Sequence, residues 1–507
     1  MPETHHVHGA PYGGACSNEG APTRTTILAA TLIGVLATAA CGSDDSPAAA
    51  APNPAATPKN IIFFLGDGYG MVPMTASRIY AAGEDGELII DTFPDTAFVK
   101  TYSNDAQVTD SAPSMSAYMT GVKMNNEVVA MSQDTKATDA SGVPYVAGAD
   151  STCPATGNGM PATTLLELAK AAGRGTGVVT TTRVTHATPA ATYAHICHRD
   201  GENTIAAQLV PGGAGYNDKL ADGVDVILGG GWQHFLPKGA AAGSSRTDAR
   251  DLVAEMKAKG YAYVTDRAGL TATPSTTARL LGLFTKGHMN FDLDRDASAE
   301  PSLAEMTTAA MDALAATKKN GYFLMVEGGR IDQALHPTLG RKALQDAKAF
   351  DDAIKAAITK ARLTDPTLAN TLIVVTADHD HTMVMNGYAA LTGKTTDTNP
   401  GILGLMRSYT DPTTPALDAD GKPFTTLVFG NGENRVSGSR GLMATLTDAA
   451  VFDKNYHQEA AVPMPTGSET HGGADVFLGA MGMGADTFHG LLDNTRVFSL
   501  VKAAAGL

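Results

Sequence analysis

The sequence predicts an α/β protein, a three-layer α/β/α sandwich around a largely parallel central sheet. Short, continuous apolar runs recur along the chain, at residues 60–65, 175–181, 321–326 and 371–376. Segments with an apolar spacing of about 3.6 residues, typical of helices, lie between such runs, for example at 163–172, 304–319 and 340–361. Strands buried on both faces have this continuous apolar character, and alternating helices cover them in parallel sheets.

Composition sets outer limits on the class of protein. The chain has 507 residues, of which 43% are hydrophobic and 18% charged, which excludes a disordered or fibrous chain. The net charge of −15 provides no basic field for nucleic acid, so we expect no specific nucleic-acid partner. Any bound phosphate would need a local cation. Four cysteines argue against a disulfide scaffold but permit one bridge.

The N-terminal residues have the pattern of an export signal. After Arg24 an apolar run ends in small residues before Cys41, so we interpret 1–41 as a signal peptide and 42–58 as an Ala/Pro-rich linker. Cleavage before Cys41 would give a lipid-anchored lipoprotein, but Thr38 stands where that motif usually has an aliphatic residue. Simple secretion and an uncleaved anchor therefore stay open. We expect export to the periplasm, to its membrane surface or outside the cell.

The rest of the chain, 59–507, is expected to be one catalytic domain with an insertion. Between about 387 and 465 the sequence changes to loops rich in Gly, Pro and Thr, with a strand-like piece at 424–429. Long irregular stretches of this kind are usually surface features. We interpret this stretch as an inserted, crown-like subdomain. No second apolar run near twenty residues follows the signal, so the body is expected to be soluble.

Acids and histidines follow the predicted strands at the points where the strands end. Asp67 follows the first run, His186 the second, Glu327 the third and Asp378 the fourth. The carboxyl ends of parallel strands meet at one edge of the sheet, where open α/β sheets bind their ligands. We therefore expect these side chains to converge.

Further ligand-type residues lie beside these strand ends, namely Asp332, His336, His379 and His471. Each alone has an ordinary explanation: a helix cap, a surface pair at i and i+4, or a solvated loop. Together, carboxylate and imidazole groups are the ligand set of zinc. The sequence therefore favours a metal centre at the sheet edge.

The stretch 109–117 carries the candidate nucleophile, Ser111. Asp-Ser before small helix formers is also the usual sequence of a helix N-terminus, so the stretch alone favours a simple cap. A serine hydroxyl becomes a good nucleophile only beside a base or a metal ion, or when its pKa is lowered. The metal ligands predicted elsewhere in the chain provide that activation.

These motifs resemble the alkaline phosphatase family, nearer its vertebrate-like branch than the enteric bacterial one. The resemblance rests on Gly175 to Arg183, Asp225 to Gly231 and Val326 to Asp332, and extends from about Lys59 to past His471. It implies hydrolysis of phosphate monoesters through a phosphoserine at a site with two zinc ions and one magnesium. It also implies a homodimer, with the insertion as a contributor to the interface.

The resemblance also implies a role for each matching residue. One zinc would be bound by Asp332, His336 and His471. The second, which also touches Ser111, would be bound by Asp67, Asp378 and His379. Magnesium would be held by Asp67, Thr188 and Glu327. Arg199 would grip the phosphate, and His381 would support the metals without binding them.

Two positions near the phosphate and the third metal depart from the family pattern. His186 and Gln333 stand where the enteric enzyme has Asp and Lys and the vertebrate enzymes have two His. We assign both residues to substrate binding, and the identity of the third metal stays open.

Cys153 and Cys197 flank the segment that leads to Arg199, and we expect them to pair in an exported protein. The alternative is two buried thiols.

Two other functions share part of this pattern: a sulfatase or phosphodiesterase, and a protein that captures phosphate or metal without catalysis. Ser111 to Met115 resembles the sulfatase signature Cys/Ser-x-Pro-Ser-Arg, but Met115 replaces the arginine that the signature requires, which disfavours a sulfatase or phosphodiesterase. A protein that captures phosphate or metal without catalysis would need the ligands but no nucleophile. The presence of Ser111 together with Arg199 disfavours that alternative.

Overall fold

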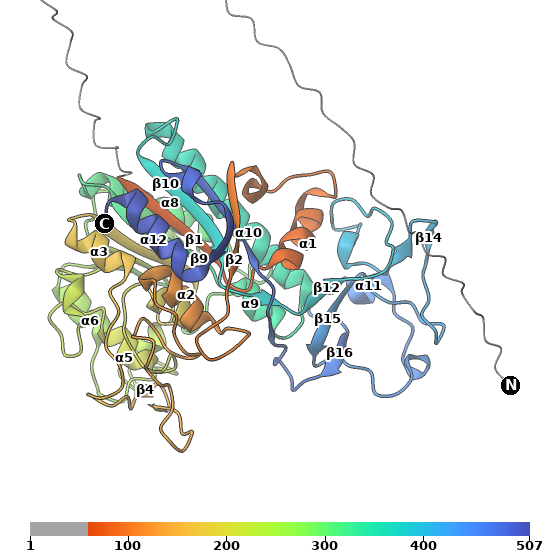
Figure 1. Ribbon diagram of the computed structural model, residues 1–507, viewed down its shortest axis with the longest axis horizontal. Helices are drawn as coiled ribbons and strands as arrows, with labels where there is room; N and C mark the ends of the chain where they lie inside the picture. Colours follow the sequence, from red (N-terminus) through yellow and green to blue (C-terminus); the bar gives the residue numbers. More distant parts are fainter. Residues whose placement is uncertain (1–58) are drawn as a thin grey trace, which may run out of the picture. The chain divides into compact units, whose positions relative to one another are not determined.

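The computed structural model of the protein describes residues 59–507, so the predicted signal peptide, the linker and Cys41 lie outside the described residues. A ten-stranded sheet runs through the described part of the chain (Figure 1). Its strands, in spatial order, are β19 (Gly490–Asp493), β2 (Asp95–Lys100), β18 (Val476–Gly482), β10 (Thr371–Ala377), β1 (Asn60–Gly66), β9 (Tyr322–Gly328), β5 (Gly175–Arg183), β6 (Val226–Gly230), β8 (Leu280–Leu283) and β7 (Ala262–Val264).

The sheet is largely parallel, as the apolar runs predict. From β10 to β7 every neighbouring pair is parallel, and only β18 pairs antiparallel with its two neighbours. The four predicted strands are β1, β5, β9 and β10, which lie next to one another at the centre. The fold class predicted from the sequence is therefore confirmed.

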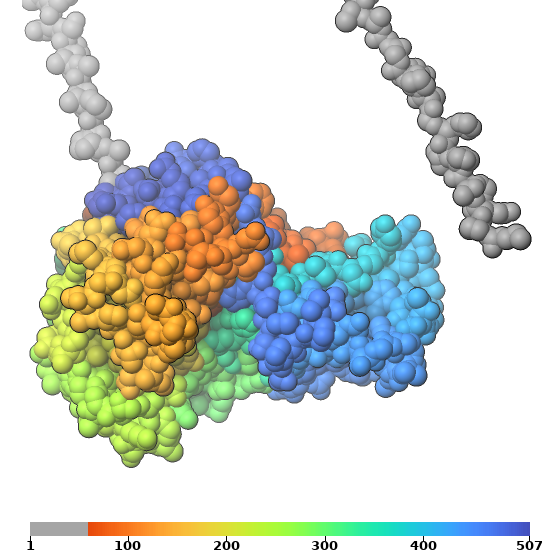
Figure 2. All heavy atoms as spheres, turned by 60° about the horizontal axis from the view of Figure 1, so that its bottom comes forward, coloured from red at the N-terminus to blue at the C-terminus, as the bar shows by residue number. Residues whose placement is uncertain are grey.

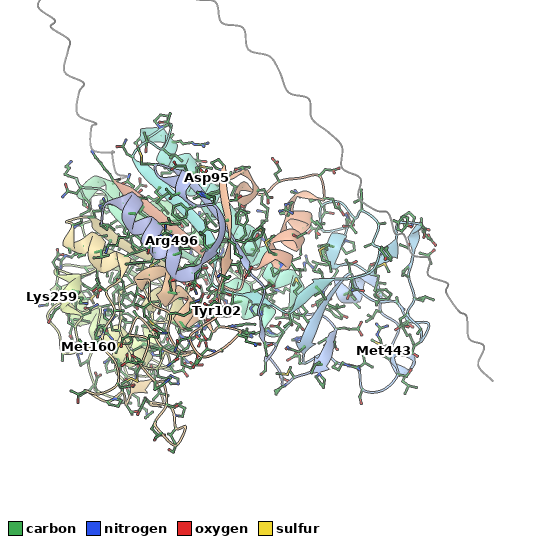
Figure 3. All side chains as sticks on the ribbon, in the orientation of Figure 1. Asp95, Tyr102, Met160, Lys259, Met443 and Arg496 are labelled. Carbon is green, nitrogen blue, oxygen red and sulfur yellow. A yellow bond between two sulfur atoms is a disulfide. The ribbon has the colours of Figure 1, made fainter. Side chains whose placement is uncertain are left out.

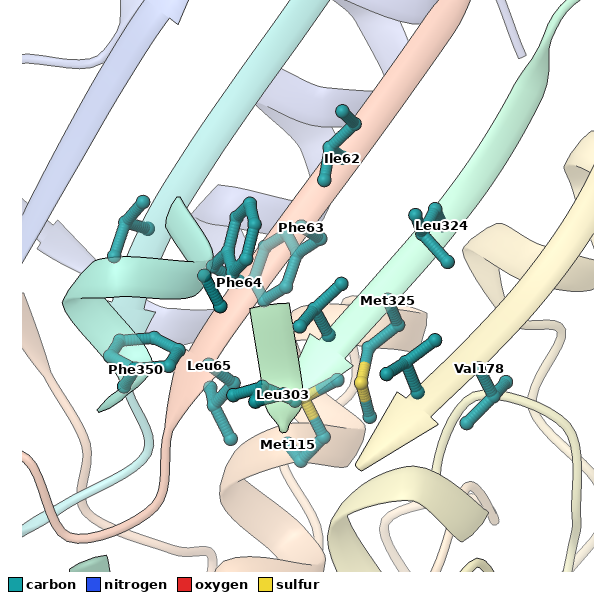
Figure 4. Packing of buried hydrophobic residues seen from close by; sticks show 14 of the residues in the cluster. Ile62, Phe63, Phe64, Leu65, Met115, Val178, Leu303, Leu324, Met325 and Phe350 are labelled. Carbon is teal, nitrogen blue, oxygen red and sulfur yellow. The ribbon is translucent and has the colours of Figure 1, made fainter. Parts of the chain in front are cut away.

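Helices cover both faces of the sheet. On β1, the neighbouring residues Phe63 and Phe64 point to opposite faces, as successive strand residues must. The ring of Phe63 lies 5.9 Å from that of Tyr118 in α2 (Ser111–Thr120), and the ring of Phe64 lies 6.0 Å from that of Phe350 in α10 (Gly340–Thr364). The helices α2 and α10 thus lie on opposite faces, and Figure 4 shows part of the core that they enclose.

The centre of the sheet supplies the core. Residues 61–65 of β1 are fully buried. Burying a large apolar side chain stabilises the folded state by about 1.5–3 kcal/mol. Truncating Phe64 to Ala would leave a cavity and cost about 3–5 kcal/mol. This rigid centre fixes the strand ends that carry the polar residues.

The predicted helices are present with small shifts at their ends. They are α3 (Leu165–Ala171), α8 (Leu303–Thr317) and α10. The helix α8 begins one residue before the predicted 304 because Ser302 caps it, and Glu305 completes the capping box. Within residues 59–507, no helix is long and apolar enough to cross a membrane.

The segment predicted as an insertion forms small sheets, one of which includes a strand just before the predicted start at about 387. One consists of β12 (Met383–Met385), β15 (Leu427–Gly432) and β16 (Ala460–Pro463), and another of β13 (Arg407–Ser408) and β14 (Asp411–Pro415). Figure 2 shows these segments in the lighter blue colours. The predicted strand 424–429 is placed three residues too early, because Thr425 instead bridges to Leu405 and its hydroxyl donates to the carbonyl of Leu427.

Candidate metal and phosphate site

Strand register brings the first acids to one place. In β1, Gly66 lies opposite Ala377 of β10 and Gly328 of β9. Asp67 and Asp378, the next residues of β1 and β10, therefore leave the sheet side by side. Glu327, near the end of β9, lies opposite Leu65. The carboxyl ends of three adjacent parallel strands thus supply three buried carboxylates, as the sequence predicts.

Ser111 is the first residue of α2, and its neighbour Asp110 is the cap. The Asp110 carboxylate accepts a hydrogen bond from the backbone N–H of Ala112 at 2.6 Å. The Ser111 hydroxyl is left to face the sheet edge, with Oγ 3.3 Å from Asp67 Oδ1 and 3.2 Å from His379 Nε2. Asp110 is therefore the helix cap, and the next residue, Ser111, is left as the candidate nucleophile.

Asp332, His336 and His471 form the first cluster. The short helix α9 (Arg330–Leu335) places Asp332 one turn before His336. The strand β17 (His471–Gly472) pairs with β11 (Asp380–His381), which brings His471 in from a distant part of the chain. Asp332 Oδ1 lies 3.3 Å from His336 Nε2 and 3.4 Å from His471 Nε2, and the two Nε2 atoms are 3.3 Å apart.

Asp67, Asp378 and His379 form the second cluster, next to Ser111. His379 Nε2 lies 3.3 Å from Asp67 Oδ1 and 3.4 Å from Asp378 Oδ2. Oδ2 of Asp378 is buried and has no hydrogen-bond partner among residues 59–507. The rings of His379 and His471 stack with their centroids 3.5 Å apart, so the two clusters adjoin.

The spacing within both clusters suits a tetrahedral ion. Ligand atoms bonded to zinc at about 2.0–2.1 Å in tetrahedral geometry lie about 3.3–3.4 Å from one another. The seven atom pairs given above, with those of Ser111 included in the second cluster, are separated by 3.2–3.4 Å. The imidazole and carboxylate donors also match zinc chemistry. The residues present therefore fit two such ions.

Backbone carbonyls set the tautomer of His336, His379 and His471, the three histidines of the two clusters. The Nδ1 atoms face the carbonyl oxygens of Glu469, Asp380 and Thr109, at 2.5 Å for His336, 3.2 Å for His379 and 2.8 Å for His471. A carbonyl can only accept, so Nδ1 must donate. In the neutral ring, each Nε2 then presents its lone pair to the cluster, as metal-binding histidines do when a carbonyl accepts from the other ring nitrogen.

A third group of oxygen atoms lies on the far side of Asp67. Oδ2 of Asp67 lies 3.4 Å from the hydroxyl of Thr188, which is carried by α4 (Ala187–Ala190). Glu327 accepts hydrogen bonds from Thr180 and Thr182 on one oxygen, whereas Oε1 is buried without a partner among the described residues. This unpaired carboxylate oxygen fits a cation bound by Asp67, Thr188 and Glu327.

Buried acids at one place shift each other's pKa. Burial, with Asp332 and Glu327 nearby, raises the pKa of Asp67 well above its ordinary value. Burial and Asp67 raise the pKa of Asp378 to about 8, and burial raises that of Glu327 to about 7. Desolvated carboxylates of this kind need a compensating positive charge in order to ionise. Metal ions at these clusters would supply it.

Arg199 is held over the site by two partners. Its Nη1 donates to Asp110 Oδ1 at 3.0 Å, and its Nη2 lies 2.9 Å from His186 Nε2. The predicted disulfide is formed between Cys153 and Cys197, two residues before Arg199. The guanidinium is therefore oriented from both sides and its backbone is tied down, as bidentate binding of an oxyanion requires.

Gln333 is placed at the edge of the site. Its amide oxygen accepts a hydrogen bond from Arg330, and its Nε2 lies 2.9 and 3.0 Å from the two ring nitrogens of His288. These contacts already engage the amide. The role of Gln333 in substrate binding stays a prediction.

Sequence reasoning missed three residues that the fold brings to the site: Asp110, His288 and Glu469. Glu469 accepts a hydrogen bond from His381 at 2.6 Å, and His381 Nε2 lies 2.8 Å from Asp332 Oδ1. This arrangement is that of a support for Asp332, as expected for His381. Asp110 and Glu469 stand in motifs that the sequence already singled out, beside Ser111 and His471. His288 belongs to none of these motifs.

Comparison with known proteins gives consistent matches. The alkaline phosphatase family model matches residues 58–507. The chain is 37% identical over 469 residues to the tissue-nonspecific alkaline phosphatase of Rattus norvegicus, covering 87% of this chain and 82% of that protein. It is 36% identical over 476 residues to the alkaline phosphatase of Gadus morhua, covering 88% and 91%.

Solved structures show the same fold. The alkaline phosphatase of Thermus thermophilus superposes with a TM-score of 0.62 at 26% identity, covering 89% of this chain and 92% of that one. The alkaline phosphatase of the Antarctic bacterium TAB5 superposes with a TM-score of 0.59 at 22% identity, covering 89% and 98%.

Proposed function

Because the chain belongs to the alkaline phosphatase family, we propose that it hydrolyses phosphate monoesters through a phosphoserine formed on Ser111, at a site for two zinc ions and one magnesium. The family makes the chain a phosphatase. The observation that carries the finer proposal is the position of Ser111 Oγ, 3.2–3.3 Å from ligand atoms of the second cluster.

Ser111, Arg199 and the N-terminus of α2 have separate roles in the proposed reaction. The Ser111 oxygen bonds to the phosphorus as the bond to the alcohol oxygen breaks, and water then hydrolyses the phosphoserine to free serine and inorganic phosphate. Arg199 binds two phosphate oxygens through its planar guanidinium. The N-terminus of α2, a helix of ten residues, adds favourable partial charge toward the phosphate and the serine oxygen. Zinc bound at the two clusters would lower the pKa of the serine hydroxyl and of water, and would offset charge on the attacking and leaving oxygens.

The binding residues point to broad substrate tolerance. The groups named above contact the phosphate and its attacking and leaving oxygens, and none is assigned to the alcohol part of the ester. Small phosphate monoesters are therefore the proposed substrates. The third site offers oxygen ligands from Asp67, Thr188 and Glu327, which suits magnesium.

Three substrates and one chelator test this proposal. We expect turnover of p-nitrophenyl phosphate to exceed that of its diester and of the corresponding sulfate by several orders of magnitude. We expect a chelator to remove the activity and zinc plus magnesium to restore it. Full activity in protein shown to be free of metal would contradict the proposal, and preferred turnover of the sulfate would favour the sulfatase alternative.

We also propose a homodimer to which the insertion contributes. Several large apolar side chains of this segment are exposed, including Tyr388 at 83%, Leu391 at 78%, Tyr409 at 70% and Leu442 at 88%. Burying these side chains against a second copy would remove apolar surface from water, which favours association. Light scattering after size-exclusion chromatography tests the proposal, and a monomer at micromolar concentration would contradict it.

Export is the last part of the proposal. It rests on the sequence of residues 1–41 and on the pairing of Cys153 with Cys197, since structural disulfides persist in oxidising compartments. Cell fractionation, combined with mass spectrometry of the mature N-terminus, tests it. Lipid attached to Cys41 would establish the anchored form, an unmodified cleaved end would establish simple secretion, and a cytoplasmic protein would contradict export.

A further inference from the structure

His288 is a half-buried histidine at the site that the proposed mechanism leaves without a role. It lies in the loop after β8, in a part of the chain far from Ser111, Asp332 and Arg199 in sequence. Arg183 donates to its Nε2, and the amide of Gln333 lies 2.9 Å from its Nδ1. The imidazole is thus held by two polar neighbours, one at the end of β5 and one in α9.

These neighbours are themselves anchored. The guanidinium of Arg183 contacts both carboxylate oxygens of Glu202, with Nε at 3.0 and 2.8 Å and Nη2 at 2.7 Å. Glu202 is buried. Gln333 accepts a hydrogen bond from Arg330, whose guanidinium stacks 3.7 Å from the ring centroid of Phe291. His288 therefore sits in a fixed frame and has little freedom to move.

The ring of His288 also packs against the ring of His186. The rings of His288 and His186 meet edge to face, with centroids 5.4 Å apart and planes at 74°. On its other side, His186 Nε2 lies 2.9 Å from Nη2 of Arg199. A chain of contacts thus runs from Gln333 and Arg183 through the packed rings of His288 and His186 to the guanidinium of Arg199, which is assigned to phosphate.

We propose that His288 is a positioning residue for phosphate binding, which holds the His186 imidazole in the orientation that aligns Arg199. The inference rests on the proposed function, because it assigns Arg199 to phosphate. Without His288, the His186 ring loses the imidazole that packs against it. The guanidinium then keeps Asp110 as its partner but loses the rigid contact at Nη2.

The proposal predicts coupling between His288 and Arg199. We expect His288→Ala to weaken binding of inorganic phosphate to the metal-loaded enzyme about fivefold, and to have less than a twofold effect in an Arg199→Ala background, because coupled residues are not additive. Calorimetry with inorganic phosphate measures both, and its inhibition constant gives a second readout. His288→Asn should restore part of the loss. His489→Ala, at an exposed position, is the matched control.

Equal losses in both backgrounds, or no loss in either, would overturn the proposal, since a merely structural residue would act independently of Arg199. If His288→Ala does not fold, Gln333→Ala removes one of its two supports and should weaken phosphate binding in the same direction, again only when Arg199 is present. Failure of the proposed function is a separate result: the wild-type enzyme would then not turn over phosphate monoesters, whatever the calorimetry shows.

Discussion

The carboxylate of Glu469 lies 2.6 Å from Nδ1 of His381, whose Nε2 is 2.8 Å from Oδ1 of Asp332. A buried carboxylate therefore orients Asp332, a proposed metal ligand, through an imidazole. Burial alone would lower the pKa of His381, but Glu469 and Asp332 raise it to about 10. Both ring nitrogens of His381 thus face carboxylates, which favour its protonated form in the metal-free protein.

This relationship gives the first prediction. Glu469→Gln should weaken zinc binding at the first cluster about 10- to 100-fold, because loss of an outer-shell partner typically has that effect. Competition with a zinc chelator measures the affinity. Glu87→Gln, at an exposed glutamate, is the control. Unchanged zinc affinity in the Glu469 variant would show that the carboxylate does not act on the metal site.

Arg199 gives the second prediction. Replacing it with Ala removes a bidentate, charge-assisted contact worth about 1.5–3 kcal/mol, which corresponds to roughly 10- to 150-fold in kcat/KM. Arg199→Lys should recover only part of the loss, because a point charge cannot replace the planar fork. Steady-state kinetics with p-nitrophenyl phosphate measures the effect. Arg496→Ala, on the exposed side of α12 (Asn494–Ala505) in Figure 3, should leave kcat/KM unchanged.

Much of the fold and site follows from local sequence, because buried strands and ligand-type residues at their ends are both readable in it. The run 60–65 and Asp67 appear in the structure as predicted. Contacts made across the chain were not predictable in the same way. His288 reaches the site only because β8 adds to the sheet beside β6. No pattern around residue 288 signals that register. The start of β15 was misplaced for a similar reason, a bridge between Leu405 and Thr425.

The pH dependence of the metal-free protein gives the third prediction. Burial and Asp67 raise the pKa of Asp378 from 3.8 to about 8, and Glu469 raises that of His381 from 6.5 to about 10 against the effect of burial. Groups with a raised pKa keep their protons in the folded state, so the stability that they provide is lost as the pH rises. Between pH 6.5 and 8, Asp378 and His381 both lower the free energy of unfolding as the pH rises.

Chelated protein should therefore unfold at lower urea concentration at pH 8 than at pH 6.5. Zinc should raise the midpoint more at pH 8, because binding requires deprotonated ligands. His471, whose pKa burial lowers to about 4, acts in the opposite direction but only below pH 6.5. Urea titrations with and without zinc at the two pH values measure this. A chelated protein that gains stability between pH 6.5 and 8 would refute the assignment.

The disulfide gives the fourth prediction. Cys153 and Cys197 close a loop with a sequence separation of 44 residues. Replacing both with Ser should lower the free energy of unfolding by about 2–4 kcal/mol. It should also raise KM, because Cys197 lies two residues before Arg199. Denaturant titration and kinetics under the same buffer conditions measure both effects. Equal stability with and without the bridge would show that the loop is held by other contacts.

Capture of a phosphorylated serine is the decisive experiment for a reaction through Ser111. Metal-loaded enzyme is mixed with excess p-nitrophenyl phosphate, quenched rapidly in acid, digested and examined by mass spectrometry. We predict one phosphoryl group on Ser111, none in the Ser111→Ala variant, and a loss of kcat on the order of 10⁴-fold or more in that variant. Near-normal turnover by Ser111→Ala, or phosphate captured on another residue such as Ser114, would contradict the account.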